Sequence, residues 1–206
     1  MAPLFNTLLN QLGNEAYKND RNFDSIINFY NAKDRCLFLD EIEEGTGSAI
    51  SAMIYFYNRV DDEENIPVEE RKPIKIYINS PGGMLTETFI MVDAIKMSKT
   101  PVWGVVTGIA YSGGFFTLLA CHKRIAYPHA SFLYHEGVTS TGGTAAQFQN
   151  YAEFYKKELE LLKDIVIEHT NITEEEYKDM KKDDVWFTTK EALEKNIIDE
   201  IAVELI

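Results

Sequence analysis

The chain has 206 residues, of which 45% are hydrophobic and 26% charged, and its formal net charge is −13. This composition is typical of a globular protein with a sizeable core, not of a disordered chain. A nucleic-acid partner is disfavoured, because phosphate binding needs clustered Lys and Arg, and the few basic pairs here lie among carboxylates. No apolar run approaches the roughly 20 residues that span a bilayer, and the chain does not open like a signal peptide. We therefore expect a cytoplasmic protein without membrane contact.

Cofactor chemistry is not indicated either. Cys36 and Cys121 are too few for a disulfide scaffold and lack metal-ligand spacing. Both lie in apolar runs, so we expect buried, unreactive thiols. No nucleotide-binding motif is present, and we predict neither a metal nor an organic cofactor.

The first half of the chain alternates between strand and helix patterns. Residues 1–23 are polar and weakly patterned and are expected to form an N-terminal arm, separate from a domain over residues 24–206. A short helix is predicted over 23–30 and a buried strand over 36–39. Helical spacing begins at 47. The acidic run 61–65 is interpreted as a solvated connection, and residues 74–79 alternate as a strand does.

The second half continues the alternation. Helices are expected over 85–97 and 113–120, and strands over 102–107, 124–127 and 131–134. The longest helix, about 145–169, carries an apolar stripe. Thr173 and Thr188 each precede a Glu by three residues, which predicts capping boxes for two short helices. Apolar strands that alternate with helices indicate an α/β fold.

Ser112 is the candidate nucleophile, because it lies in Gly-Ile-Ala-Tyr-Ser-Gly-Gly where an apolar strand should turn into a helix. Such an elbow exposes a serine to attack from one side. Gly113 and Gly114 would place free N–H groups at the start of the helix, where negative charge is favoured. The Gly82-Gly83 turn after the strand 74–79 could also face an oxyanion. Taken alone, each motif is more often a purely structural turn.

His135 and Asp184 could complete a triad. His135 ends the strand 131–134 and could present one ring nitrogen to a serine and the other to a carboxylate. Asp184 precedes Val-Trp-Phe and is the favoured carboxylate, although the adjacent Asp183 competes. A strand histidine or an aspartate in a Lys-Lys-Asp-Asp run is often only structural. The hypothesis of a serine hydrolase therefore depends on the whole set.

In this order, the motifs resemble those of the proteolytic subunit of the Clp protease. The resemblance covers about residues 24–204 and rests on Ile-Asn-Ser-Pro-Gly-Gly over 78–83, the serine elbow over 108–114, Phe-Leu-Tyr-His over 132–135, the long helix ending in Glu-His-Thr-Asn, and Asn-Ile-Ile-Asp over 196–199. It implies a crotonase-like spiral of ββα units from which the long helix projects as a handle.

The resemblance also implies an activity and its residues. Ser112 would be the nucleophile, His135 the general base and acid, and Asp184 the orienting carboxylate, with the N–H groups of Gly83 and Gly113 as the oxyanion hole. Extended, unfolded polypeptide would pair with Ser80, Pro81 and Gly82 and with a strand after His135. The resemblance further implies a heptameric ring, possibly stacked into a tetradecamer, and an AAA+ unfoldase partner.

Several positions depart from the family pattern. Gly113 replaces the usual Met, Glu136-Gly137 replaces Gln-Pro, and Asp183 replaces an Arg that helps two rings engage. Residues 65–72 look like an insertion. Two alternatives therefore stay open: a catalytically silent ring subunit that assembles with active paralogues, and an acyl-CoA enzyme of the crotonase fold.

Overall fold

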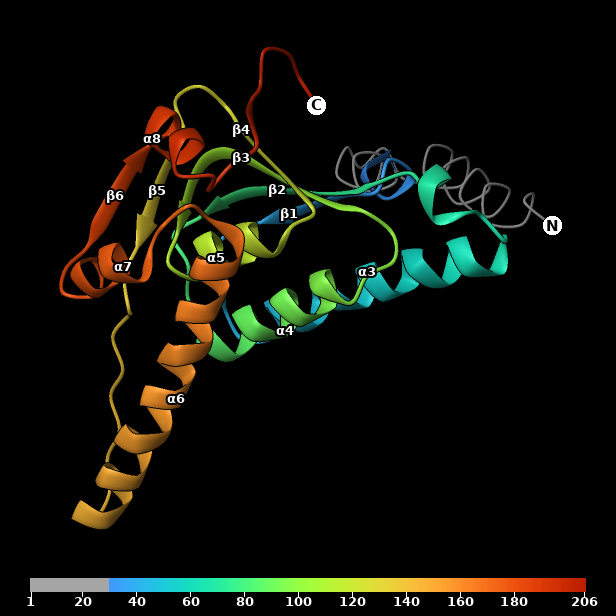
Figure 1. Cartoon of the computed structure of the whole chain (residues 1–206). Coiled ribbons are helices and arrows are strands. Elements are labelled where there is room, and N and C mark those ends of the chain that lie inside the picture. Colours follow the sequence, from blue (N-terminus) through green and yellow to red (C-terminus); the bar gives the residue numbers. More distant parts are fainter. Residues whose placement is uncertain (1–29) are drawn as a thin grey trace, which may run out of the picture.

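A seven-stranded sheet organises residues 30–206, the part of the chain that the computed structural model describes (Figure 1). The predicted arm over 1–23 and nearly all of the helix predicted over 23–30 lie outside the described residues. The strand order is β1-β2-β3-β4-β7, with β5 paired to β3 and to β6. Every pairing is parallel except that of β5 with β6. The strands are β1 (Cys36–Leu39), β2 (Ile74–Ser80), β3 (Val102–Tyr111), β4 (Lys123–Ala126), β5 (Ser131–Tyr134), β6 (Val185–Thr188) and β7 (Glu200–Ile201).

Helices connect these strands, as parallel pairing requires. They are α3 (Thr46–Glu63), the short 3₁₀ helix η1 (Val68–Glu70), α4 (Leu85–Lys96), α5 (Gly113–Ala120), α6 (Ala145–His169), α7 (Glu174–Met180) and α8 (Thr189–Glu194). Figure 1 shows α3 and α4 side by side along one face of the sheet, with α5 next to them and α6 projecting away from the body. The α/β prediction is confirmed.

Strand β3 is longer than the predicted 102–107 and connects both parts of the sheet. Its first half pairs with β4 and its end pairs with β5, while β2 lies along its other edge. Gly108 made the strand look shorter, because glycine is unfavourable in strands. In the structure, a Cβ at Gly108 would lie 2.4 Å from Asn79 Oδ1, so glycine allows this close approach and the strand continues to Tyr111.

All eight residues of α5 are buried. Its Phe115 ring lies 6.2 Å from that of Tyr134 and 6.5 Å from that of Phe187. These contacts join the helix after β3 to both strands of the β5–β6 pair. The packing therefore fixes the end of β3 relative to the ends of β5 and β6.

Helix α6 is buried only at its carboxyl end. It begins with a capping box formed by Thr144 and Gln147, which we did not predict, whereas the two predicted boxes at Thr173 and Thr188 are present. Of the predicted apolar stripe, Leu162 and Val166 are buried, while Phe148 is 58% exposed. The projecting part of α6 therefore carries apolar surface that the described part of the chain does not cover.

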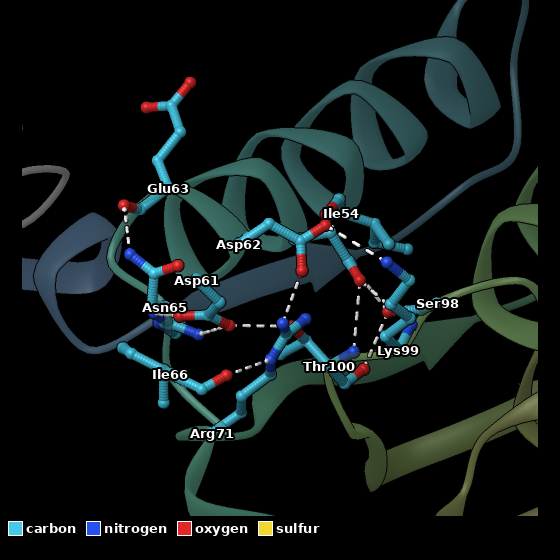
Figure 2. Close-up of polar contacts among 12 residues, drawn as sticks. Ile54, Asp61, Asp62, Glu63, Asn65, Ile66, Arg71, Ser98, Lys99 and Thr100 are labelled. Carbon is cyan, nitrogen blue, oxygen red and sulfur yellow. Dashed lines mark hydrogen bonds and ion pairs between the residues drawn. The ribbon is translucent and has the colours of Figure 1, made fainter. Parts of the chain in front are cut away.

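The acidic run 61–65, expected to be a solvated connection, is exposed at Asp62, Glu63 and Asn65 but not at Asp61. Asp61 lies in the last turn of α3 and is fully buried. Arg35 donates to both of its carboxylate oxygens at 2.5 and 2.8 Å, and Thr100 donates to it at 2.7 Å. Arg71 pairs with Asp62, which also contacts Lys99 (Figure 2). The burial of Asp61 was not predicted because its partners Arg35 and Thr100 are 26 and 39 positions away, so they leave no local pattern.

Two further findings concern burial. Cys121 is buried, which raises the pKa of its thiol to about 12, but Cys36 is only half-buried, because it begins the outermost strand of the sheet, so the expectation of two buried thiols is wrong for it. Within residues 30–206, no helix is both long and apolar enough to cross a membrane.

Replacing Asp61 by Ala should reduce the free energy of unfolding by about 3–5 kcal/mol, because Arg35 would stay buried without its carboxylate partner. The matched control is Glu63→Ala, which removes an exposed partner of Arg59 on the same helix and should change stability by less than about 0.5 kcal/mol. Urea unfolding measures both. A loss below about 1 kcal/mol for Asp61→Ala would contradict the assigned role of the pair.

The same pair predicts a pH dependence of stability. Burial alone would raise the pKa of Asp61, but the hydrogen bonds from Arg35 and Thr100 outweigh burial and lower it. The stabilisation is therefore complete above the unfolded-state pKa of about 3.9 and is lost as the pH falls through the lower folded-state pKa. Between about pH 5 and pH 3, wild type should lose more stability than Asp61→Ala does.

Candidate active site

Ser112 alone connects β3 to α5, with a backbone conformation that non-glycine residues rarely adopt. Its φ is 51° and its ψ is −120°. Its N–H donates to the carbonyl of Leu133 at 3.0 Å, and its carbonyl accepts from Phe115 and Phe116 at the start of α5. Such strain costs about 1–3 kcal/mol and persists only where the surroundings impose it. Here the buried helix and strand β5 impose it, and Ser112 is held at a sharp turn.

The Gly82-Gly83 turn lies against this elbow. A Cβ on Gly82 would lie 2.6 Å from Cβ of Ser112, so no larger residue fits there. Gly82 and Gly83 have φ values of 96° and 150°, which also favour glycine. The turn therefore lies against the serine elbow with no room for a side chain between them.

A parallel bridge between Ile42 and Gly83 orients the turn. Ile42 N–H donates to the Gly82 carbonyl at 2.9 Å, and Met84 N–H donates to the Ile42 carbonyl at 2.8 Å. In such a bridge, the N–H of Gly83 itself points away from Ile42. Within residues 30–206, no backbone hydrogen bond outside the regular elements uses the N–H of Gly83 or Gly113. The two amides are thus available as donors beside Ser112.

His135 and Asp184 are brought together by the β5–β6 pair. Tyr134 pairs with Val185 at the end of the two antiparallel strands. His135, which follows Tyr134, therefore lies opposite Asp184, which precedes Val185. His135 Nδ1 and Asp184 Oδ1 are 3.7 Å apart, which is longer than a hydrogen bond. Asp183 instead accepts the N–H of Asp184 with its own side chain at 2.9 Å. Asp184, rather than Asp183, is therefore the carboxylate that lies close to His135.

One cavity of about 980 Å³ brings together the elbow, the glycine turn and His135, but Asp184 does not line it. Its lining includes Ser112, Gly113, Gly83, His135 and Pro81.

The other two predicted substrate contacts, Ser80 and Gly82, are buried and do not line this cavity. Ser80 Oγ accepts the N–H of Gly82 at 3.1 Å, so this side chain shapes the turn. The strand expected after His135 is absent, since residues 135–144 have no regular structure. No neighbouring strand pairs with them in the described chain. Tyr155 holds the segment against α6 by donating to the Glu136 carbonyl at 2.9 Å.

Glu87 is a residue of the site's framework that the sequence pattern did not reveal. It lies in the first turn of α4 and is only 8% exposed. Its Oε2 accepts the N–H groups of Gly47 and Ser48 at 2.8 and 3.3 Å. The N-cap of α3 is Gly45, which has no side chain to do this. Glu87 therefore caps α3 from another helix and holds the loop that carries Ile42. A contact across 40 positions gives no local signal.

Within residues 30–206, no group of three or more His, Cys, Asp or Glu residues is arranged to hold a metal ion. What the cavity presents is an accessible hydroxyl, an imidazole and two free backbone N–H donors. This combination is suited to acyl transfer, in which a nucleophile attacks a carbonyl and the oxyanion is bound by N–H groups.

The sequence is similar to proteins of one family. The family model described as Clp protease matches residues 18–204. The ATP-dependent Clp protease proteolytic subunit 2 of Cutibacterium acnes is 33% identical over 172 residues, covering 82% of this chain and 77% of that protein. The protein of the same name from Prochlorococcus marinus is 31% identical over 175 residues, covering 82% of this chain and 81% of that protein.

Replacing Glu87 by Ala should destabilise the protein by about 1–3 kcal/mol, because the buried N–H of Gly47 and the partly buried N–H of Ser48 would lose their acceptor. Hydrogen exchange of the backbone over residues 42–48 should become faster, since the loop loses its anchor. Glu87→Gln is the control, because its amide oxygen can still accept these bonds. Equal exchange in wild type and Glu87→Ala would show that the loop does not depend on this contact.

Proposed function

This chain belongs to the Clp protease family, and on that premise we propose that it is a serine endopeptidase that cleaves unfolded polypeptides. The observation that carries the proposal is the strained elbow of Ser112, which faces the same cavity as His135 and the amides of Gly83 and Gly113. A serine held in this way, lining one cavity with an imidazole and with free N–H donors, supplies the groups that acyl transfer to water requires.

In the proposed reaction, Ser112 Oγ attacks the carbonyl carbon of the scissile bond while His135 takes the hydroxyl proton. The N–H groups of Gly83 and Gly113 bind the oxyanion. His135 then gives its proton to the leaving amine, and an acyl-enzyme forms. Water attacks this ester by the same route in reverse, which releases the carboxylate product and restores Ser112.

Asp184 is assigned the orienting role. It would stabilise the positive charge that His135 acquires on protonation. It would also orient the imidazole so that Nε2 faces the serine. The distance of 3.7 Å must shorten by nearly an ångström for a hydrogen bond. Catalytic hydrogen bonds are commonly long in unliganded enzymes and tighten when substrate binds.

We infer that the chain works as a ring-shaped homo-oligomer, a heptamer or a stacked pair of heptamers, in the cytoplasm and with an AAA+ unfoldase. The apolar surface on the projecting part of α6, including Phe148, Phe154 and Leu161, supports assembly because such patches mark protein contacts. The exposed Asp183 stands where the family usually has Arg, so stacking of two rings would need another contact.

A catalytically silent ring subunit is the second candidate. The His135–Asp184 separation and the 56% exposure of the Asp184 side chain favour it. The two functions differ in whether the purified chain alone reacts at Ser112.

We predict that a fluorophosphonate labels the purified chain at Ser112 and that mass spectrometry locates the adduct there. His135→Ala should abolish labelling, whereas Ser48→Ala, at an exposed serine on α3, should leave it unchanged. Peptide hydrolysis by Ser112→Ala should fall by a factor on the order of 10⁶ in kcat. A chain that assembles into rings but neither reacts with the probe nor cleaves peptides would establish the silent subunit instead.

A further inference from the structure

Carboxylates from three separate segments border the Ser112 cavity. Glu41, Glu43 and Glu44 come from the loop between β1 and α3, beside the Ile42–Gly83 bridge. Glu136 and Glu158 come from the segment after His135 and from α6. No Lys or Arg from residues 30–206 lines the cavity. The space around the proposed nucleophile is therefore bordered by negative charge on both sides.

These five carboxylates are not neutralised by the protein. Over residues 30–206, none of them lies within 4.0 Å of a Lys, Arg or His nitrogen. Elsewhere in the fold, carboxylates do find such partners, as Glu176 does with Lys195 at 2.5 Å. The negative charge at the cavity is thus free to act on whatever enters it.

Glu136 and Glu158 act on the same region of the cavity. Tyr155, which also lines it, donates to the Glu136 carbonyl. The pKa of Tyr155 is raised, first by burial and then by the nearby Tyr151, Glu136 and Glu158. Both carboxylates therefore disfavour negative charge at Tyr155. Glu136 directly follows His135, so this potential lies next to the proposed base.

The cavity also has apolar lining, including Met84, Leu85, Phe116 and Leu162. A side chain that fits both surfaces needs an aliphatic stem and a positive head. Lys and Arg have this structure, because their methylene groups pack on apolar surface while the charged end reaches polar groups. Asp and Glu would bring like charge toward five carboxylates.

We propose that the Ser112 cavity selects polypeptide segments with Lys or Arg close to the scissile bond and disfavours segments with Asp or Glu there. The inference rests on the proposed peptidase function and adds a substrate class to it. Glu136 and Glu158 are the specificity-determining residues on the His135 side. Glu41, Glu43 and Glu44 act on the side of the oxyanion glycines.

The test uses the assembled full chain and three fluorogenic peptides that differ only in two positions flanking the cleaved bond, which carry Lys, Gln or Glu. We expect kcat/KM to fall in the order Lys, Gln, Glu, with a Lys-to-Glu ratio of about tenfold or more. This ratio should shrink as salt is raised from 0.05 to 0.5 M, because salt screens charges near the surface. Binding of the same peptides to the Ser112→Ala variant is also measured, by fluorescence anisotropy.

Substitutions test which glutamates cause the preference for Lys over Glu. The double variant Glu136→Gln with Glu158→Gln should bring the Lys-to-Glu ratio several-fold closer to one. Glu153→Gln is the matched control, because Glu153 is an exposed residue of α6 outside the cavity, and it should leave the ratio unchanged.

The outcomes separate the two proposals. Cleavage of the Gln peptide with a Lys-to-Glu ratio near or below one would overturn the charge selection and leave the peptidase function standing. If no peptide is cleaved, the proposed function fails, and binding to Ser112→Ala still decides the selection. Preferential binding of the Lys peptide would then support the charge selection, and equal binding would refute it.

Discussion

The constraint on which the structure around the cavity depends is the backbone of Ser112. Ser112 is not a glycine, yet its φ is positive, because β3 ends at the residue before it and α5 begins at the residue after it. The energy that this conformation costs is offset by the packing of α5, whose eight residues are all buried. The glycine turn over 82–83 then approaches the strained residue from β2. Function at this elbow is inseparable from the packing of the helix behind it.

Charge is handled in two opposite ways within this one domain. Asp61 is taken out of water and satisfied by Arg35 and Thr100, so it holds α3 to the segments before β1 and β3. The glutamates around the Ser112 cavity are left without basic partners among the described residues. A buried charge must be paired, whereas a charge at a cavity wall can remain available to a ligand. The net charge of −13 therefore hides two distinct uses of carboxylates.

Local patterns were sufficient for most elements and for the placement of the elbow. Helix α3, strand β2 and helix α5 follow from periodicity and from glycine turns, and two capping boxes follow from Thr-x-x-Glu. Ser112, His135 and Gly83 were expected near one another, and all three line one cavity. The predictions that failed concern residues whose contacts are with distant parts of the sequence. The burial of Asp61 and the cap that Glu87 provides involve residues far away in the sequence, and a strand after His135 has no neighbour to pair with.

The antiparallel ribbon of β5 and β6 has a mechanical consequence. His135 and Asp184 extend from the same end of this ribbon, whereas Ser112 lies between β3 and α5. The ribbon is joined to this elbow by the pairing of Ile109–Tyr111 with Ser131–Leu133 and by the bond from the Ser112 N–H to the Leu133 carbonyl. The Phe115 ring adds packing against Tyr134 and Phe187. Imidazole and carboxylate thus share one support, and its register against the serine is set by backbone pairing and by an aromatic side chain that belongs to none of the three groups.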